Sequence, residues 1–385
     1  MSMNTQGRPT APGEAESGYR PKTFTGNRGL DMEEPLIFEF GHFETMGVDL
    51  DEPEDFAPEL GHHARAAELE LPGLAEPEAM RHYVRLSRNN YAIDSGLYPL
   101  GSCTMKHNPR LNEKMARLPG FGDIHPLQPL STVKGAVELI DELARWLMVS
   151  TGTSAVAMSP KAGAHGELCG MMAIKAAHKA AGRDPKMVLV PESAHGTNPA
   201  TAALLGYKVV SIDAQDDGTV DLAALKATIA EHEGNVAAIM LTNPNTCGLF
   251  EREIIEIAEE IHKADAYFYC DGANFNAIVG KARPGDLGVD AMHINLHKTF
   301  STPHGGGGPG SGPVVLSDRL APFAPLPFIR QTDNGPVLVE TEADTLEGEQ
   351  PFGRMTAFHG QMGMFVRALA YMMSHGSDGL KQASE

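Results

Sequence analysis

From about residue 131 onward the chain alternates between helix-like and strand-like segments, and this alternation limits the fold more than any other feature. The first of these helices is expected behind Ser131, which has the side chain of an N-cap residue. Its apolar residues recur at helical spacing, at Val133, Val137, Ile140, Leu143 and Leu147. A second helix is expected from about 166 to 181, where Gly182 would end it.

Short apolar strands separated by further helices follow this pair. The predicted strands are 187–190, 207–212, 236–242, 266–270, 290–296 and 313–316. The predicted helices between them are 198–205, 221–232 and 251–263. Strands joined through helices form a mostly parallel sheet covered on both faces, so the sequence predicts an α/β fold.

Polar clusters follow four of the predicted strands. They are Ser193–Asn198, Thr242–Thr246, Asp271 and the pair His297–Lys298. In sheets of this kind ligands bind beyond the carboxyl ends of the strands. The four clusters therefore predict a single site at that edge of the sheet.

Lys298 and Asp271 indicate what chemistry this site performs. Lys298 comes directly after a short apolar stretch and before a glycine-dense loop, and Asp271 follows the apolar segment 267–270. A lysine that forms a Schiff base and a carboxylate that keeps a pyridine nitrogen protonated are the minimum equipment of a pyridoxal-phosphate enzyme. Taken singly, either residue is more often an ordinary surface residue. Their shared position after buried strands favours the cofactor site.

Other residues near these strand ends are candidates for contacts with the cofactor. His195 is placed to stack on the cofactor ring, and His297 to contact the phosphate or the substrate carboxylate, although a structural role is open for both. Asn243 and Asn274 could reach the phenolic oxygen or cap a turn. The glycine-containing segment 159–167 opens a helix, where backbone amides and the helix dipole attract phosphate.

Composition narrows the setting. The net charge of −19 argues against nucleic acid or an anionic membrane as the main partner. No apolar run approaches the ~20 residues of a membrane span, and the N-terminus lacks the apolar core of a secretory signal. The cysteines are far apart, at Cys103, Cys169, Cys247 and Cys270. This spacing indicates neither a disulfide framework nor a zinc ribbon, so a reducing cytoplasm is expected.

The charge is unevenly distributed along the chain. Residues 1–80 hold 17 acidic against 5 basic residues, whereas seven basic residues fall within 81–117. These seven are Arg81, Arg85, Arg88, Lys106, Arg110, Lys114 and Arg117. They are equally compatible with a solvated helix face and with a cationic rim for an anionic substrate or an acidic partner protein.

Two rival interpretations come from other classes of protein. His293 and His297 have the i, i+4 spacing of zinc ligands on a helix, but residues 291–296 alternate like a strand and no glutamate follows His293. No metal site is therefore predicted. A scaffold subunit that kept the fold without catalysis is the second rival, and the presence of both Lys298 and Asp271 argues against it.

Four motifs together resemble the glycine cleavage system P-protein family, most closely subunit 2 of its two-subunit bacterial form. They are Leu97–Lys106, Ser193–Pro199, Asp271–Asn274 and Asn295–Phe300 with the glycine loop behind it. The resemblance runs from about residue 30 to the end. It implies the aspartate-aminotransferase type (fold type I) large domain and the cofactor pyridoxal 5'-phosphate. It also implies decarboxylation of glycine, with transfer of the aminomethyl group to the lipoyl arm of the H-protein.

The resemblance also implies roles for individual residues. Lys298 is the cofactor lysine, Asp271 the partner of the pyridinium nitrogen and His195 the ring-stacking group. Gly163 and Ala164 fall where phosphate contacts occur in related enzymes. Tyr98 and Cys103 belong to a mobile segment over the substrate, where Cys103 is a candidate redox-sensitive thiol.

The domain plan completes these expectations. We expect an extended acidic arm over 1–80, an active-site loop and connecting segment over 81–130, a cofactor-binding large domain over 131–330, and a linker into a truncated C-terminal small domain over 331–385. Subunit 1 and the lipoylated H-protein are the expected partners, with two copies of each subunit. The chain as written is expected to have weak activity or none.

Overall fold

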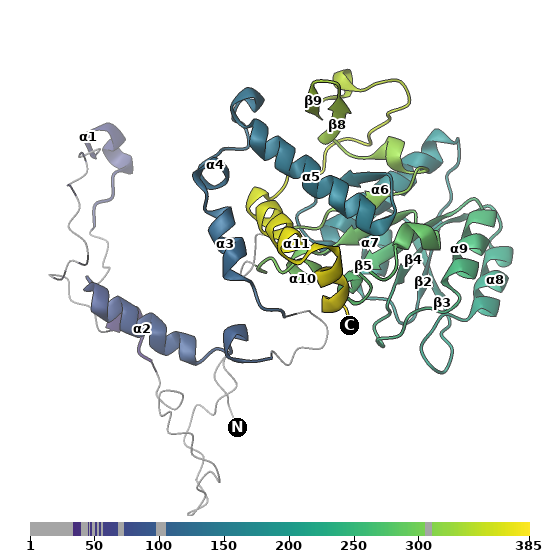
Figure 1. Cartoon of the computed structure of the whole chain (residues 1–385), viewed down its shortest axis with the longest axis horizontal. Coiled ribbons are helices and arrows are strands. Elements are labelled where there is room, and N and C mark those ends of the chain that lie inside the picture. The colour runs from purple at the N-terminus through teal and green to yellow at the C-terminus, as the bar shows by residue number, and fades with distance from the viewer. Residues whose placement is uncertain are drawn as a thin grey trace, which may run out of the picture. The chain divides into compact units, whose positions relative to one another are not determined.

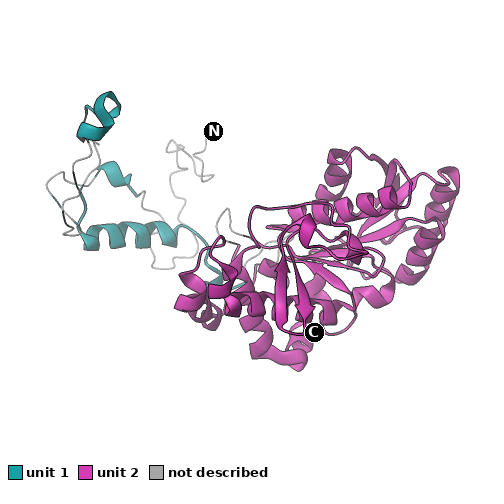
Figure 2. Ribbon diagram, turned by 90° about the horizontal axis from the view of Figure 1, so that it is seen from above, with its two compact units in different colours: residues 1–98 teal, residues 99–385 magenta. Residues whose placement is uncertain are grey.

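The computed structural model of the chain describes residues 34–39, 45, 47, 51, 54, 57–67, 73–97, 105–304 and 310–385. Contacts divide the chain into two compact units, residues 1–98 and residues 99–385 (Figure 2). Tyr98 and Cys103, predicted for the segment over the substrate, fall outside the described residues.

The main helix of the first unit is α2 (Glu76–Arg88), which follows the short α1 (Ala57–Leu60). Arg85 on α2 donates to Glu34 with Nε 2.6 Å from Oε2, and His82 Nδ1 lies 2.9 Å from Oε1 of the same carboxylate. The hydrogen bond from Arg85 is the main reason that the pKa of Glu34 is lowered to about 2. One member of the basic stretch is therefore paired with an acidic residue of its own unit.

The second unit is built on a seven-stranded sheet in the order β1-β7-β6-β5-β4-β2-β3. Its strands are β1 (Ala155–Ala157), β2 (Met187–Pro191), β3 (Lys208–Ile212), β4 (Val236–Thr242), β5 (Tyr267–Gly272), β6 (Ala291–Ile294) and β7 (Val314–Leu316). The strands from β3 to β6 pair in parallel, and β7 runs antiparallel to both of its neighbours. The predicted mostly parallel sheet is confirmed.

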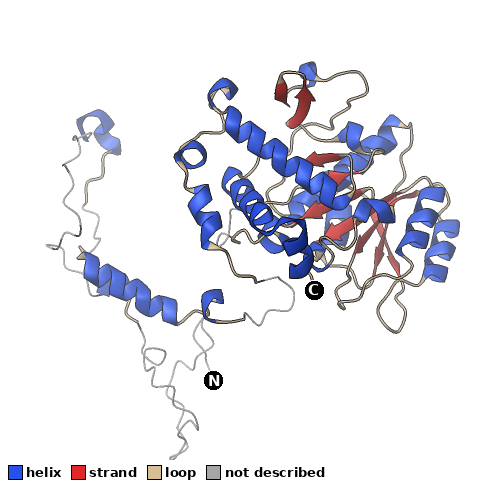
Figure 3. Ribbon diagram, in the orientation of Figure 1, coloured by secondary structure: helices blue, strands red, loops and turns tan. Residues whose placement is uncertain are grey.

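Helices cover both faces of this sheet (Figures 1 and 3). The α-helices of this unit are α3 (Arg110–Ala116), α4 (Pro119–Gly122), α5 (Lys134–Thr151), α6 (Gly163–Ala180), α7 (Thr197–Leu204), α8 (Leu222–Glu231), α9 (Ile254–Lys263), α10 (Leu296–Thr299) and α11 (Met362–Ala383). A separate hairpin is formed by β8 (Phe328–Thr332) and β9 (Gly335–Val339). No helix within the described ranges combines the length and apolarity that crossing a membrane requires.

The predicted N-cap of the helix after residue 131 is wrong. Helix α5 begins at Lys134 with Val133 in the N-cap position. Ser131 lies in a separate 3-10 turn, Leu130–Thr132, which the Thr132 hydroxyl closes by donating to the Pro129 carbonyl at 2.7 Å. That turn uses the polar side chains of the segment, so the helix starts after it.

Alternation along the strands sends neighbouring side chains into two separate cores. On β5, Phe268 and Cys270 pack with α5, α9 and α11, whereas Tyr267 and Tyr269 pack with α6 and α7. Strand side chains point to opposite faces in turn, so both cores draw on the same strands. Asp271, the next residue, points to the α6 face because it has the parity of Tyr269.

Helix α6 lies unusually close to the sheet. A Cβ atom on Gly166 would sit 2.7 Å from Cβ of His293, and one on Gly170 would sit 2.6 Å from the ring of Tyr269. Both positions need glycine because real Cβ atoms do not approach other atoms this closely. The close approach brings the first turns of α6 against the ends of β5 and β6.

Candidate active site

A cavity of about 460 Å³ opens where β4, β5 and β6 end and α6 begins. Its lining combines acidic, basic and hydroxyl side chains from segments far apart in the sequence. The lining residues are Gly163, Ala164, Glu167, His195, Thr197, Thr242, Thr246, Asp271, Ala273, Asn274, His293, Asn295 and Lys298.

Most of the residues predicted from the sequence meet in this cavity. Lys298, on the first turn after β6, and Asp271, on β5, line it together. Four more predicted residues also line it, namely His195, Asn274, Gly163 and Ala164. Asn243 and His297 are not among the lining residues. Asn243 Oδ1 instead accepts the backbone N–H of Glu251 at 3.0 Å.

Asp271 is a buried carboxylate held by three neighbours. Its Oδ1 accepts the backbone N–H of Ala273 at 2.9 Å, and its Oδ2 accepts from Asn198 Nδ2 at 3.2 Å. His293 Nε2 lies 3.4 Å from Oδ1. Burial alone would raise the pKa of Asp271, but His293, these hydrogen bonds and the charge of Lys298 outweigh it and lower the pKa below its usual value. The carboxylate therefore stays charged at neutral pH.

His293 fixes Asp271 from the neighbouring strand. The two residues are paired across β5 and β6, and both side chains are almost fully buried. His293 Nδ1 lies 2.6 Å from the hydroxyl of Tyr269, and Nε2 lies 3.2 Å from Oδ1 of Asn295. Burial raises the pKa of Tyr269 well above its usual value, so the phenol keeps its proton while it is hydrogen-bonded to His293 Nδ1.

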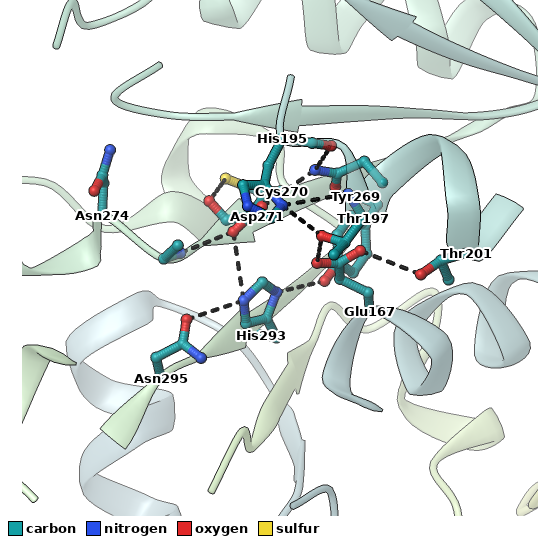
Figure 4. A network of polar contacts seen from close by, with 12 residues as sticks. Glu167, His195, Thr197, Thr201, Tyr269, Cys270, Asp271, Asn274, His293 and Asn295 are labelled. Atoms are coloured by element: carbon teal, nitrogen blue, oxygen red, sulfur yellow. Dashed lines mark hydrogen bonds and ion pairs between the residues drawn. The ribbon is translucent and has the colours of Figure 1, made fainter. Parts of the chain in front are cut away.

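Glu167 is a second buried carboxyl group, on the first turns of α6, and it is 3% exposed. It accepts hydrogen bonds from the hydroxyls of Thr197 at 2.7 Å and Thr201 at 3.2 Å. Burial raises its pKa, and the hydrogen bond from Thr197 only partly offsets this effect. Figure 4 shows both acids with the side chains that contact them. The two differ in pKa, since that of Asp271 is lowered and that of Glu167 is raised.

The start of α6 suits an anion. The N-cap residue of this 18-residue helix is Ala162, whose side chain cannot accept a hydrogen bond from the first backbone amides. A Cβ on Gly163 would sit 2.7 Å from Nδ2 of Asn295, so glycine keeps this corner open. Thr242 Oγ1, also in the cavity, is buried without a hydrogen-bond partner among the described residues. These groups could accept a phosphate and one further polar group of a cofactor.

His297 lies behind the cavity among other bases. Its ring centroid is 5.0 Å from that of His304, and Lys106 Nζ lies 3.5 Å from His304 Nδ1. Burial, followed by the charges of His304, Lys298 and Lys106, lowers the pKa of His297 to about 4. The imidazole is therefore neutral at physiological pH. His293 lies on β6 and His297 on α10, so the two do not share one helical face, although the strand predicted from the alternation of residues 291–296 ends earlier, at Ile294.

Sequence reasoning gave no individual role to Glu167, Thr197, Asn198, His293 or Asn295, although Thr197 and Asn198 lie in the cluster Ser193–Asn198 that it predicted for the site. The motif that carries His195 also contains Thr197 and Asn198, and helical spacing from Thr197 leads to Thr201. Nothing local marks Glu167 or His293. Their roles depend on the register between β5 and β6 and on how closely α6 approaches the sheet.

Comparisons with known proteins agree with this geometry. Residues 167–308 match the family model "Aminotransferase class-V". A Caulobacter vibrioides protein named "Probable glycine dehydrogenase (decarboxylating) subunit 2" is 65% identical over 100% of this chain and 73% of its own length. A Thermococcus gammatolerans protein of the same name is 48% identical over 93% of this chain and 70% of its own length.

A solved structure supports the fold alone. The crystal structure of glycine decarboxylase (P-protein) of the glycine cleavage system, in inhibitor-bound form, superposes with a TM-score of 0.66 at 20% identity. The match covers 85% of this chain and 73% of that one. The fold and the cavity together define a pyridoxal-phosphate-dependent enzyme with the aminotransferase fold. Within that class, the chain belongs to the family of glycine dehydrogenase (decarboxylating) subunit 2.

Proposed function

We propose that this chain is the cofactor-carrying subunit of a glycine decarboxylase. It removes the carboxylate of glycine as carbon dioxide and passes the aminomethyl group to the lipoyl arm of an H-protein. The names of its relatives support the reaction, and the resemblance seen in its motifs supports the acceptor. The observation that carries the proposal is the pairing of Lys298 with the buried, charged Asp271 in one cavity.

The residues present fit pyridoxal phosphate. The first amides of α6 at Gly163 and Ala164 would hold its phosphate, Lys298 its aldehyde carbon and Asp271 its ring nitrogen. His195 would lie against the ring, and Asn274 is the candidate for its phenolic oxygen. When bound, the cofactor supplies a protonated heterocycle that takes up the electron pair released as the carboxylate leaves.

Asp271 performs the electrostatic part of this chemistry. Because its carboxylate stays charged, it would keep a proton on the nitrogen of a bound pyridine ring. Asn198, Ala273 and His293 fix the direction of the carboxylate before any ligand binds, so no reorganisation is required during the reaction. Lys298 would offer its amine to the bound cofactor, and the amine of the substrate could then take its place.

Glycine has no side chain to recognise, so a small, closed site is expected. A poorly hydrated pocket also favours the loss of a charged carboxylate as a neutral gas. The segment from Tyr98 to Lys106 is our candidate for closing over the substrate. Subunit 1 and the H-protein are the proposed partners, with two copies of each subunit in the assembly and the cytoplasm as its location. The word "subunit" in the relatives' names supports the first of these partners.

The test is glycine-dependent exchange of labelled bicarbonate into the glycine carboxyl group. It needs this chain loaded with pyridoxal phosphate, subunit 1 and lipoylated H-protein, and Lys298→Ala serves as the inactive control. Exchange that depends on glycine, on the H-protein and on Lys298 supports the proposal. Cofactor binding without exchange, together with turnover of another small amino acid such as serine or cysteine, would replace it with an aldolase or desulfurase activity.

A further inference from the structure

The side chains of Glu167, Thr197 and His195 are connected by hydrogen bonds, from a buried residue to an exposed one. Glu167 Oε1 lies 2.7 Å from the Thr197 hydroxyl, and the same hydroxyl lies 2.7 Å from Nδ1 of His195 (Figure 4). Glu167 is buried on α6, Thr197 opens α7 and is half-buried, and His195 is exposed in the loop before it. These hydrogen bonds thus join an acid inside the protein to an imidazole that faces the cavity.

A hydroxyl group has one hydrogen, so Thr197 cannot donate to both neighbours at once. When Glu167 is ionised, the hydroxyl donates to the carboxylate and must accept a hydrogen bond from His195, so Nδ1 carries the imidazole proton. When Glu167 is protonated, the acid can donate to Thr197, and the hydroxyl is then free to donate to Nδ1. In that case the proton of the neutral ring is on Nε2.

We propose that Glu167 is a positioning residue for His195 and that, through the Thr197 hydroxyl, it decides which ring nitrogen of His195 carries the proton. One backbone contact differs between the two arrangements. The Thr197 N–H donates to His195 Nδ1 at 3.3 Å, and this contact requires a lone pair on Nδ1. The backbone contact therefore fits the protonated form of Glu167, whereas a hydrogen bond donated by the Thr197 hydroxyl to Oε1 fits the ionised form, and ionisation of Glu167 reverses both hydrogen bonds of the hydroxyl.

The surroundings of Glu167 raise its pKa above the usual value of a glutamate. The groups that face it are the Thr197 and Thr201 hydroxyls on α7, Asp271 and Tyr269 on β5, and His293 on β6. Burial and the charge of Asp271 raise the pKa of Glu167, whereas the two hydroxyls and His293 lower it by less. Geometry defines the two states, and burial shifts the balance between them toward protonated Glu167.

The protonation of Glu167 decides whether Nε2 of His195 donates or accepts a hydrogen bond in the cavity. Its role toward a bound ligand rests on the proposed function. With Glu167 protonated, Nε2–H can donate to the bound cofactor or substrate. With Glu167 ionised, Nε2 offers a lone pair and can accept a proton there. A single proton taken up by Glu167 thus changes His195 from an acceptor to a donor at the reacting ligand, without moving either residue. The total number of protons on the imidazole stays the same.

The experiment reads the tautomer directly, by nitrogen-15 NMR of the histidine rings in the protein loaded with pyridoxal phosphate. The chain has 16 histidines, so the His195 signals are assigned by their loss in His195→Gln. At pH 9 the wild type is expected to carry the proton on Nδ1. In Thr197→Val, which deletes the hydroxyl and keeps the shape of the side chain, it is expected on Nε2.

Matched control variants distinguish the effect of the Thr197 hydroxyl on the His195 tautomer from a general disturbance of the fold. Thr201→Val removes the other hydroxyl on Glu167 but not the link to His195, so its tautomer at pH 9 should match the wild type. Thr197→Ser keeps a hydroxyl and should restore the wild-type tautomer. Glu167→Gln cannot ionise, so the tautomer of the neutral ring should be the same at pH 7 and pH 9.

The proposal is overturned if Thr197→Val and the wild type show the same tautomer at pH 9, or if Thr201→Val changes it as much as Thr197→Val does. These outcomes can be read whether or not the protein decarboxylates glycine. Failure of the proposed function would appear separately, as absent bicarbonate exchange with the wild-type chain.

Discussion

Replacing Gly166 with alanine tests whether the close approach of α6 builds the cofactor site. The new Cβ would lie 2.7 Å from Cβ of His293 and 2.8 Å from the carbonyl oxygen of Gly312. Neither atom is at the end of a flexible side chain. Ordinary contacts begin at 3.4 Å, so one group has to move by about 0.7 Å. A movement of this size is enough to stretch the 2.6 Å hydrogen bond from Tyr269 to His293 beyond normal length.

Two opposing contributions determine how Gly166→Ala changes the free energy of unfolding. Alanine favours a helix over glycine by about 1 kcal/mol, while overpacking a tight core costs about 1–3 kcal/mol. Gly135, on the exposed start of α5, supplies the control, because a Cβ added there would have no atom within 4 Å. Gly135→Ala should raise the free energy of unfolding by up to about 1 kcal/mol. Gly166→Ala should lie about 1–3 kcal/mol below that control.

Two assays check this prediction. Denaturant unfolding followed by circular dichroism gives the difference in stability between the two variants. Titration with pyridoxal phosphate, followed by its visible absorption, gives the cofactor affinity, which should fall in Gly166→Ala and stay at the wild-type level in Gly135→Ala. If Gly166→Ala matches Gly135→Ala in both assays, α6 does not press on His293 and the account of the site is refuted.

Three further predictions follow from charge and burial. Asp271→Asn removes the charge that would hold a proton on the ring nitrogen, and this charge is expected to raise the pKa of that nitrogen by about 1–3 units. Bicarbonate exchange should therefore fall about 10- to 1,000-fold. An unchanged rate would contradict the role assigned to Asp271. The pKa of His297 is about 4 in the folded chain and near 6.5 when exposed, so the unfolded chain binds more protons between these values. Stability should therefore be lost as pH falls from 6.5 to 4, and His297→Asn should show a shallower loss in denaturant titrations over that range. A thiol reagent at pH 8 should modify the exposed Cys247 and spare the buried Cys169 and Cys270, and mass spectrometry identifies the modified sites. Burial raises the pKa of Cys270 to about 12 and that of Cys169 further, so neither forms the reactive thiolate at this pH. Rapid labelling of either buried thiol would show that these cores open.

Much of the large unit could be predicted from periodicity. The helices and strands after residue 131 alternate in sequence as they do in the sheet, and β4 was predicted with its observed bounds of 236–242. The three-residue β1 and the hairpin of β8 and β9 were not predicted. A strand as short as β1 has no periodicity to detect, and it forms only because β7 pairs with it. The antiparallel direction of β7 is likewise a property of its neighbours.

The sequence by itself determined the chemistry that the cavity contains. Lys298, Asp271 and His195 each follow a strand of a parallel sheet, and the carboxyl ends of such strands meet at one edge. Their meeting could therefore be inferred without coordinates. Their detailed roles in holding a cofactor remain predictions that the proposed experiments test.

Only the tertiary structure decided how these groups are tuned. His293 contacts Asp271 because β5 and β6 pair in one register, and a shift by one residue would turn it to the other face. Glu167 reaches Thr197 because Gly166 and Gly170 let α6 lie against the sheet. Hydrogen-bond lengths and the loss of water around a buried acid depend on distances between segments that are far apart in the sequence. Local sequence patterns carry no information on these distances.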